Sequence, residues 1–90
     1  MKTIHKFPLK ITDMQQIIVS YDSEILTAQF QNDQLCLWVL VDTEKAPVSR
    51  FIEILGTGNP IPTDMGIDRK YISTAQQHSG SLVWHIFERL

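Results

Sequence analysis

The chain has 90 residues, a formal net charge of −2 and a hydrophobic fraction of 43%. A chain of this length makes a single domain, 1–90, and it buries only about 60% of its unfolded surface, so its core is thin. The slightly acidic balance argues against a long-range attraction to nucleic acid or to an anionic membrane.

The sequence also bounds the compartment. Its apolar runs are too short to cross a bilayer, and its start lacks the basic and apolar regions of a signal peptide. The single cysteine, Cys36, cannot close an internal disulfide. We therefore expect a protein of a reducing cytoplasm.

Residues 1–11 alternate between two faces, which predicts a strand. Pro8 has no N–H to donate, so this strand should lie at a sheet edge or carry a bulge. Lys2, Lys6 and Lys10 form a basic row on one face. The row could contact phosphate or an acidic partner, or it could guard the edge against aggregation, and the acidic net charge favours the guard.

Residues 16–20 predict a short strand, and residues 25–41 predict a hairpin that turns at Asn32-Asp33. A slip of one residue would move every side chain of the hairpin to the opposite face. The arm 35–41 is apolar on both faces, which predicts a central strand covered on two sides. The pairs expected are Phe30–Leu35, Ala28–Leu37 and Leu26–Val39 on one face, and Gln29–Cys36, Thr27–Trp38 and Ile25–Leu40 on the other.

Residues 48–55 predict a further strand, in which each face mixes apolar and charged side chains. The next stretch, 56–62, reads GTGNPIP, and its glycines and prolines exclude a regular element. We expect irregular chain to continue over 63–68.

Residues 70–90 predict a second hairpin, with Gly80 in the left-handed conformation of the turn 77–80. The pairs expected are Lys70–Glu88, Tyr71–Phe87, Ile72–Ile86, Ser73–His85 and Thr74–Trp84. No segment has a convincing helical period. The sequence therefore predicts an all-β fold: a small single-domain antiparallel β barrel or sandwich of six to seven strands, with hairpins at 25–41 and 70–90.

The loop Gly56, Thr57, Gly58 and Asn59 is the best candidate for a binding site. Glycines allow successive backbone N–H groups to converge in a nest that binds phosphate or carboxylate oxygens. The lysine of a phosphate-binding P-loop is absent, and the prolines that follow prevent the helix that a dinucleotide-binding motif needs. The alternative is that the loop is only a tight corner between strands.

Aromatic and histidine residues of the last hairpin extend this candidate site. Tyr71 or Trp84, if either emerges beside the glycine loop, could stack on a flat ring such as a nucleobase. His85 could form a metal pair or an acid–base couple with His5 if the first and last strands pair. No Cys or His lies at zinc-like spacing, so we expect no metal and no cofactor. His78 should be solvated at its turn.

For nucleophilic catalysis, the expected register offers Ser73 facing His85 and no other serine–histidine pairing. No G-x-S-x-G motif accompanies it. Cys36 lies mid-strand among apolar residues, where a thiol is structural rather than reactive. The sequence therefore favours binding over catalysis, and we name no catalytic residue.

The same residues carry a resemblance over nearly the whole chain. The succession IHKFPLKITD, LCLWVLVD, GTGNPIP and YISTAQQHSGSLVWHIFE resembles a family of short proteins of unknown function from tailed bacteriophages and prophages. Its most specific pieces are GTGNPIP and LVWHIFE. The chain departs from the family pattern at 20–24, which replaces a Pro-x-Gly-Ala type of turn, and at Ser73 and Ser79, where glycine is common. The resemblance implies a phage accessory protein in the cytoplasm of an infected bacterial host, and it implies no reaction and no catalytic residue.

These features together lead us to expect a non-enzymatic binding protein that serves host takeover or counter-defence. It would capture a host protein or a small anionic signal, such as a nucleotide, at the glycine loop. The alternatives are a structural or assembly protein, such as a minor virion adaptor, and a small enzyme acting through His85 and Ser73. A thin core and exposed strand edges favour a homodimer.

Overall fold

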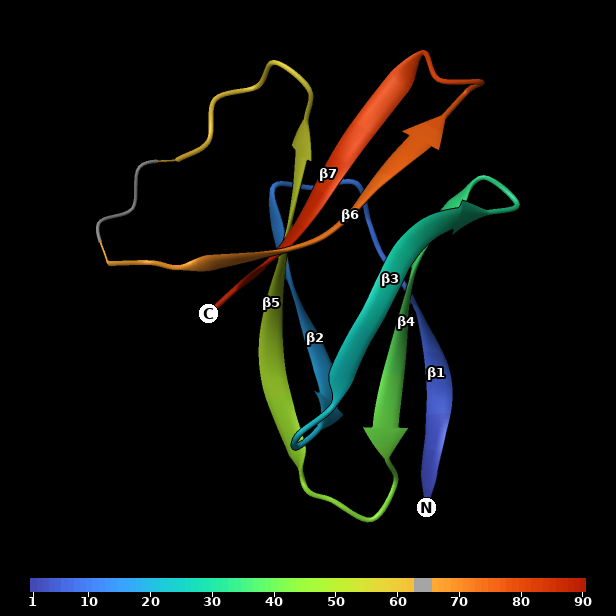
Figure 1. The fold of residues 1–90 in the computed structure, drawn as a ribbon, viewed down its shortest axis with the longest axis vertical. Helices are drawn as coiled ribbons and strands as arrows, with labels where there is room; N and C mark the ends of the chain where they lie inside the picture. Colours follow the sequence, from blue (N-terminus) through green and yellow to red (C-terminus); the bar gives the residue numbers. More distant parts are fainter. Residues whose placement is uncertain (63–65) are drawn as a thin grey trace.

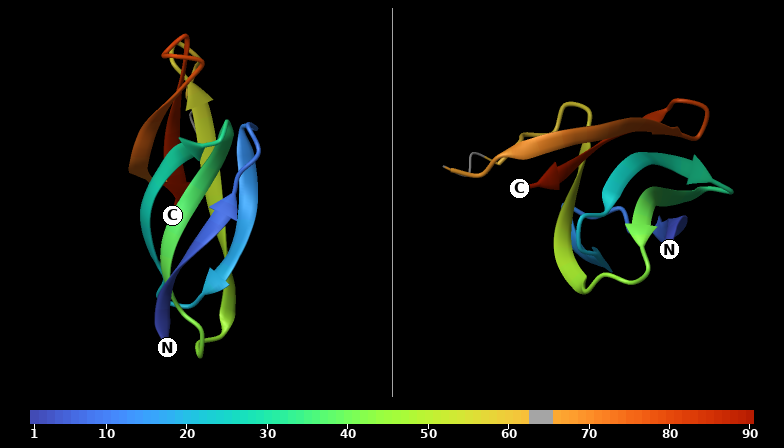
Figure 2. Two further views of the ribbon diagram at one scale, coloured as in Figure 1. Left: turned by 90° about the vertical axis from the view of Figure 1, so that its right-hand side faces the viewer. Right: turned by 60° about the horizontal axis from the view of Figure 1, so that its bottom comes forward.

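The computed structural model describes residues 1–62 and 66–90, which form seven β-strands. The strands are β1 (Lys2–Pro8), β2 (Met14–Ser20), β3 (Glu24–Gln31), β4 (Gln34–Asp42), β5 (Pro47–Gly56), β6 (Arg69–Gln77) and β7 (Leu82–Arg89). They pair antiparallel in two sheets, with the orders β1-β4-β3 and β2-β5-β7-β6 (Figure 1). The two sheets form separate layers and do not join into a closed barrel (Figure 2). The all-β prediction is confirmed, with the sandwich as the observed architecture.

Two further expectations concern the chain between β5 and β6 and the absence of a membrane-spanning segment. The irregular chain expected over 63–68 begins with residues 63–65, which lie outside the described residues, and 66–68 form no strand. Within 1–62 and 66–90 there is no helix with the length and apolar character that a membrane crossing requires.

β4 is the central strand of the three-stranded sheet, as its apolar sequence predicts. Leu35, Cys36 and Leu37 are all buried. Cys36 is enclosed within its sheet because it lies between Gln29 of β3 and Pro8 of β1. The prediction that the proline-containing first strand is an edge strand is also confirmed.

The β3–β4 hairpin has the predicted turn and most of the predicted register. Asn32 and Asp33 both have positive φ, 50° and 63°, as a tight hairpin turn of type I′ requires. The pairs from Thr27–Trp38 to Phe30–Leu35 are confirmed. A β-bulge at Leu26 then shifts the register, so that Ile25 pairs with Val39 and the predicted pairs Leu26–Val39 and Ile25–Leu40 are wrong.

The β6–β7 hairpin contains a second bulge, at Ile72. The pairs Lys70–Glu88 and Tyr71–Phe87 are confirmed, and Gly80 has the expected positive φ of 89°. Beyond the bulge every predicted pair is wrong by one residue. Ser73 pairs with Ile86, Thr74 with His85, Ala75 with Trp84, and the turn lengthens because Gln77 pairs with Leu82.

The bulge at Ile72 turns Ser73 toward the other sheet, where its hydroxyl joins the two layers. Ser73 Oγ accepts a hydrogen bond from the buried Ala28 N–H of β3 at 2.8 Å. It also lies 3.0 Å from Thr27 Oγ1. β3 is an edge strand, so this side chain satisfies an amide that no neighbouring strand of its own sheet can reach. The β3 and β6 edges thereby close one side of the sandwich.

The opposite side of the sandwich is open between β1 and β2. A groove of about 220 Å³ lies there, with Phe7 from β1, Val19 from β2 and Val41 from β4 among its lining residues. The core lies between the sheets and packs against Phe7. The buried core residues are Leu9, Ile17, Val19, Ala28, Leu35, Leu37, Val39, Val41, Ile52, Ile54, Ala75 and Ile86.

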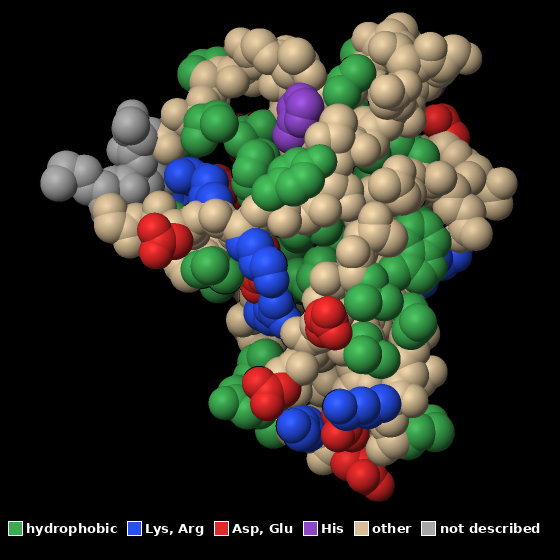
Figure 3. Space-filling model, viewed as in Figure 1, with side chains coloured by type: hydrophobic (Ala, Val, Ile, Leu, Met, Phe, Trp, Pro, Cys, Tyr) green, Lys and Arg blue, Asp and Glu red, His purple; other side chains and the backbone are tan. Residues whose placement is uncertain are grey.

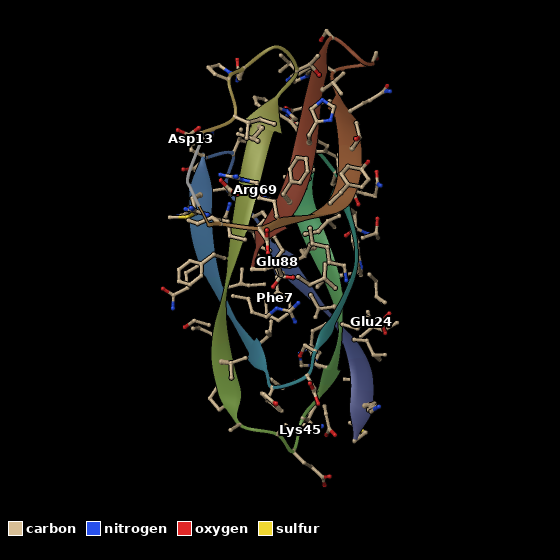
Figure 4. The ribbon with its side chains drawn as sticks, turned by 60° about the vertical axis from the view of Figure 1, so that its left-hand side comes forward. Phe7, Asp13, Glu24, Lys45, Arg69 and Glu88 are labelled. Atoms are coloured by element: carbon tan, nitrogen blue, oxygen red, sulfur yellow. The ribbon has the colours of Figure 1, made fainter. Side chains whose placement is uncertain are left out.

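The charged residues of β5, Arg50 and Glu53, each form an ion pair that is partly or fully buried. Arg50 Nε lies 2.5 Å from Glu88 Oε2, and Arg50 Nη2 lies 2.7 Å from Oε1. The hydrogen bond that Arg50 donates to the Glu88 carboxylate raises the pKa of Arg50 above its ordinary value. Glu88 lies between the layers, as does Phe7 (Figure 4). In the second pair the buried Glu53 carboxylate accepts a hydrogen bond from Arg69 Nε at 2.6 Å.

Candidate functional site

The alternation of β7 decides which of the predicted site residues share a face. Trp84 points inward and packs against the core. His85 and Phe87 point outward, because they follow Trp84 by one and three residues in the strand. Tyr71 and Thr74 of β6 pair with Phe87 and His85 and point the same way. The outer face of β5, β7 and β6 therefore carries the exposed part of the candidate site.

A chain of polar contacts crosses this face, and we call it the polar track: Thr57, His85, Thr74 and Tyr71. Thr57 Oγ1 lies 2.7 Å from His85 Nε2. The other ring nitrogen, Nδ1, lies 3.2 Å from Thr74 Oγ1. Thr74 Oγ1 in turn lies 2.7 Å from the hydroxyl oxygen of Tyr71. The track thus connects the end of β5 to the outer edge of the sheet.

The partners of His85 hold its ring in place. Each threonine hydroxyl can donate or accept, so the imidazole has a partner at both nitrogens in either neutral tautomer. Tyr71 is fixed as well, because its ring packs edge-on against Phe87 with centroids 5.7 Å apart. The track therefore presents oriented donors and acceptors beside two aromatic rings, an arrangement suited to recognition.

The glycine loop is a turn whose amides are largely used inside the protein. Thr57 N–H donates to Val83 O at 3.2 Å, and Asn59 N–H donates to Gly56 O at 3.0 Å. Gly58 has a φ of 87°, as the third position of a type II turn requires. Because these two N–H groups are already bonded, the loop geometry favours the corner over the anion-binding nest. Its contribution to the face is the Thr57 side chain.

Gly56 and Trp84 lie on the inward side of the sheet, away from the polar track. They pair across β5 and β7, and a Cβ placed on Gly56 would come within 3.3 Å of the indole ring and 2.8 Å of Asn59 Nδ2. The Trp84 indole N–H donates to Gln77 Oε1 at 3.1 Å. The structure thus separates Trp84 from Tyr71, and one flat ring cannot stack on both.

The predicted register pair Ser73–His85, on which the alternative of a small enzyme depends, is wrong. The bulge at Ile72 places Ser73 opposite Ile86, on the inward face, whereas His85 points outward. The hydroxyl of Ser73 is engaged with Thr27 and the Ala28 amide. Neither group can therefore act on the other.

The histidines do not form a pair. β1 and β7 belong to different sheets, so His5 is not a neighbour of His85 through strand pairing. His5 lines the groove between β1 and β2, and His78 is exposed in the β6–β7 turn. In the part of the chain that the structure describes, no cluster of three or more His, Cys, Asp and Glu side chains is placed to hold a metal ion.

Sequence reasoning missed Thr74, which links His85 to Tyr71. The uninterrupted register paired Thr74 with Trp84, and only a bulge in β6 brings it opposite His85. No local pattern in the sequence marks this bulge, and without it alternation puts Tyr71 and Thr74 on opposite faces.

A protein-family model described as "Domain of unknown function (DUF7352)" matches residues 1–90. The chain belongs to this family. The expectation of an uncharacterised family is thereby confirmed, and membership in DUF7352 assigns neither a reaction nor a partner. Searches of curated proteins and of solved structures found no match.

Proposed function

We propose that this DUF7352 protein is a bacteriophage or prophage accessory protein that binds a host protein in the cytoplasm of the infected bacterium. Its role would be host takeover or counter-defence, exerted by binding and not by catalysis. The observation that carries the proposal is the polar track, which is ordered by hydrogen bonds yet ends at the exposed Tyr71.

The surface around the track favours a protein partner over a small ligand. Small-molecule sites are concave and enclose most of their ligand, whereas this track runs across the outer face of a sheet. Figure 3 shows hydrophobic side chains beside a histidine on the upper part of this face, with Lys, Arg, Asp and Glu side chains below them and toward the sides. Interface centres are depleted in charge and enriched in tyrosine.

The phage origin and the cytoplasmic location are supported by the resemblance that GTGNPIP and LVWHIFE carry. A small anionic ligand has less support, because the Thr57 and Asn59 amides are bonded within the protein. The enzyme that acts through His85 and Ser73 has none, because the two residues lie on opposite faces.

Affinity capture from infected cells tests the proposal with three baits: the unchanged chain, Tyr71→Ala and Tyr21→Ala. The two tyrosines are 55% and 59% exposed, and Tyr21 lies in the β2–β3 turn, outside the track. We expect a host protein retained by the unchanged chain and by Tyr21→Ala. Tyr71→Ala should weaken it at least tenfold, since a central tyrosine is worth about 2 kcal/mol.

The remaining outcomes replace the proposal. Heat extraction of the captured chain followed by mass spectrometry would reveal a bound nucleotide, which would favour a small anionic ligand instead. Presence of the protein in purified virions, unaffected by Tyr71→Ala, would favour the structural or assembly role. Equal capture by all three baits would remove the polar track from the binding surface.

A further inference from the structure

The sheets have four edge strands among the described residues, and three of these edges are guarded. β1 carries Pro8 and a row of lysines. β3 and β6 lie against each other, bridged by Ser73. β2 reads MQQIIVS and contains neither a charged residue nor a proline. Proteins block exposed edges with such devices, so an unguarded edge indicates that another strand covers it.

The hydrogen bonds flanking β2 show which of its backbone groups face that edge. Ile54 N–H donates to Asp13 O, and Tyr21 N–H donates to Ala46 O. Hydrogen-bonded and non-bonded pairs alternate along an antiparallel ladder, so the odd-numbered residues of β2 bond to β5. The N–H and C=O groups of Met14, Gln16 and Ile18 therefore point away from β5, toward the open edge.

We propose that β2 of a second copy of this chain covers this edge, antiparallel and related by a two-fold axis at Gln16. The outward side chains of β2 run Met14, Gln16, Ile18, which is apolar, polar, apolar and symmetric about Gln16. Self-pairing about that residue puts Met14 of each copy against Ile18 of the other and Gln16 against Gln16. Each facing pair then exchanges both its N–H and its C=O groups.

The character of the edge favours a second copy over an unrelated strand. A strand without charge meets itself without like-charge repulsion, whereas β1 meeting itself would bring its lysines together. A two-fold interface also requires a patch that is complementary to itself, which the symmetric order of β2 provides.

The side chains around this edge are also incompletely buried in one copy. Ile18 is 53% exposed and Met14 45%, and Phe51 of β5 pairs with Gln16 between them. Joining two copies makes one eight-stranded sheet in which Met14 of each copy packs against Ile18 of the other, on either side of the Gln16 pair. The groove that Phe7 and Ile18 help to line lies beside this edge, on the open side of the sandwich.

This inference goes beyond the proposed function and does not depend on it. β2 and β6 lie at opposite edges of the four-stranded sheet. The polar track therefore stays uncovered when β2 pairs, and a loss of one interaction leaves the other intact.

The first test compares the molar mass of two matched variants across a dilution series by sedimentation equilibrium. Ile18→Lys adds to β2 the guard that β1 already has, and we expect the mass of one chain, 10.4 kDa. Ile4→Lys changes an equally exposed isoleucine, 56% against 53%, on the outer face of β1, and it should keep the doubled mass of the unchanged chain. An unchanged chain that is monomeric throughout, or Ile18→Lys that stays dimeric, would overturn the proposal.

The second test fixes the register and does not rely on the lysine variant being folded. Gln16→Cys should form a disulfide between copies under mild oxidation, because residue 16 faces itself with Cα atoms about 5.5 Å apart. Cys36 is buried and does not compete. Ile18→Cys, which would face Met14, should cross-link far more slowly. The reverse order of rates, or no linkage at residue 16, contradicts the two-fold axis at Gln16.

Discussion

Ser73 lies where the two sheets meet, and its hydroxyl has partners on the other side of that contact. One of these is the buried Ala28 amide, which would otherwise be an unsatisfied donor. Such a donor costs about 1–3 kcal/mol when its acceptor is removed. One hydroxyl therefore contributes to the contact between the two layers.

Ser73→Ala should lower the free energy of unfolding by about 1–3 kcal/mol, because the alanine leaves the Ala28 N–H without its acceptor. Chemical denaturation followed by tryptophan fluorescence measures the change. Ser81→Ala is the control, since Ser81 is exposed and bonds only to the His78 carbonyl within its own turn. Equal effects of the two substitutions would show that Ser73 does not join the sheets.

Asp42 gives the protein a pH dependence at the end of β4. The backbone N–H of Glu44, 3.1 Å from Asp42 Oδ1, lowers the pKa of Asp42 below its ordinary 3.8. The N-terminal amino group and Lys45 act in the same direction, and partial desolvation opposes them. A carboxyl with a lowered folded-state pKa stabilises the fold above its unfolded pKa, and this stabilisation disappears as pH falls through the folded value.

Asp42→Asn should therefore lower the melting temperature at neutral pH and have a smaller effect in strong acid, where the natural carboxyl is protonated. Thermal unfolding of both chains across an acid titration measures the difference. Glu44→Gln is a poor control because the Glu44 carboxylate lies 3.4 Å from the same N-terminal amino group, so Glu24→Gln, at an exposed position of β3, is preferred. A constant difference between the two chains at every pH would contradict this assignment.

At the scale of the strand, the turns could be predicted from the sequence and the bulges could not. Asn32-Asp33 and Gly80 are local signals, because positive φ is a property of the residue itself. The bulges at Leu26 and Ile72 lie in strands that meet through Thr27, Ala28 and Ser73. Their positions depend on a contact between segments about 45 residues apart, which no local pattern contains.

The same limit decided which candidate site residues were placed correctly. The predicted pair of Tyr71 with Phe87 is correct because Tyr71 precedes the bulge in β6. His85 was predicted to pair with Ser73 but pairs with Thr74, because Ser73 and Thr74 both follow the bulge. A single extra residue in β6 thus replaces the predicted Ser73–His85 pair with the observed contact between Thr74 and His85.

The Arg50–Glu88 pair tests how strongly β5 and β7 are joined. Glu88→Gln leaves Arg50 charged beside a neutral amide, and we expect a loss of about 3 kcal/mol in unfolding free energy, at the low end for a buried pair because Arg50 is partly exposed. Glu24→Gln is the matched control, since Glu24 is exposed at the surface (Figure 4). A loss below about 1 kcal/mol, as exposed pairs give, would mean that solvent screens this pair.

At the scale of the whole molecule, the sandwich is closed along β3 and β6 and open along β1 and β2. The closed side lies next to the polar track, and the open side carries the proposed contact with a second copy. A two-fold axis through β2 would put both polar tracks on the same side of one sheet. A partner with two matching surfaces would then bind far more tightly than either surface alone allows.

The order of the strands along the chain also affects how the protein is made. β5 needs β7 beside it, and β3 needs Ser73 of β6, yet both of these strands belong to the final hairpin. Until that hairpin has been synthesised, the edges of β3 and β5 that it covers are exposed. The nascent chain is therefore most vulnerable to aggregation before β6 and β7 have been synthesised, and a chaperone that shields exposed strand edges would be most useful at that stage.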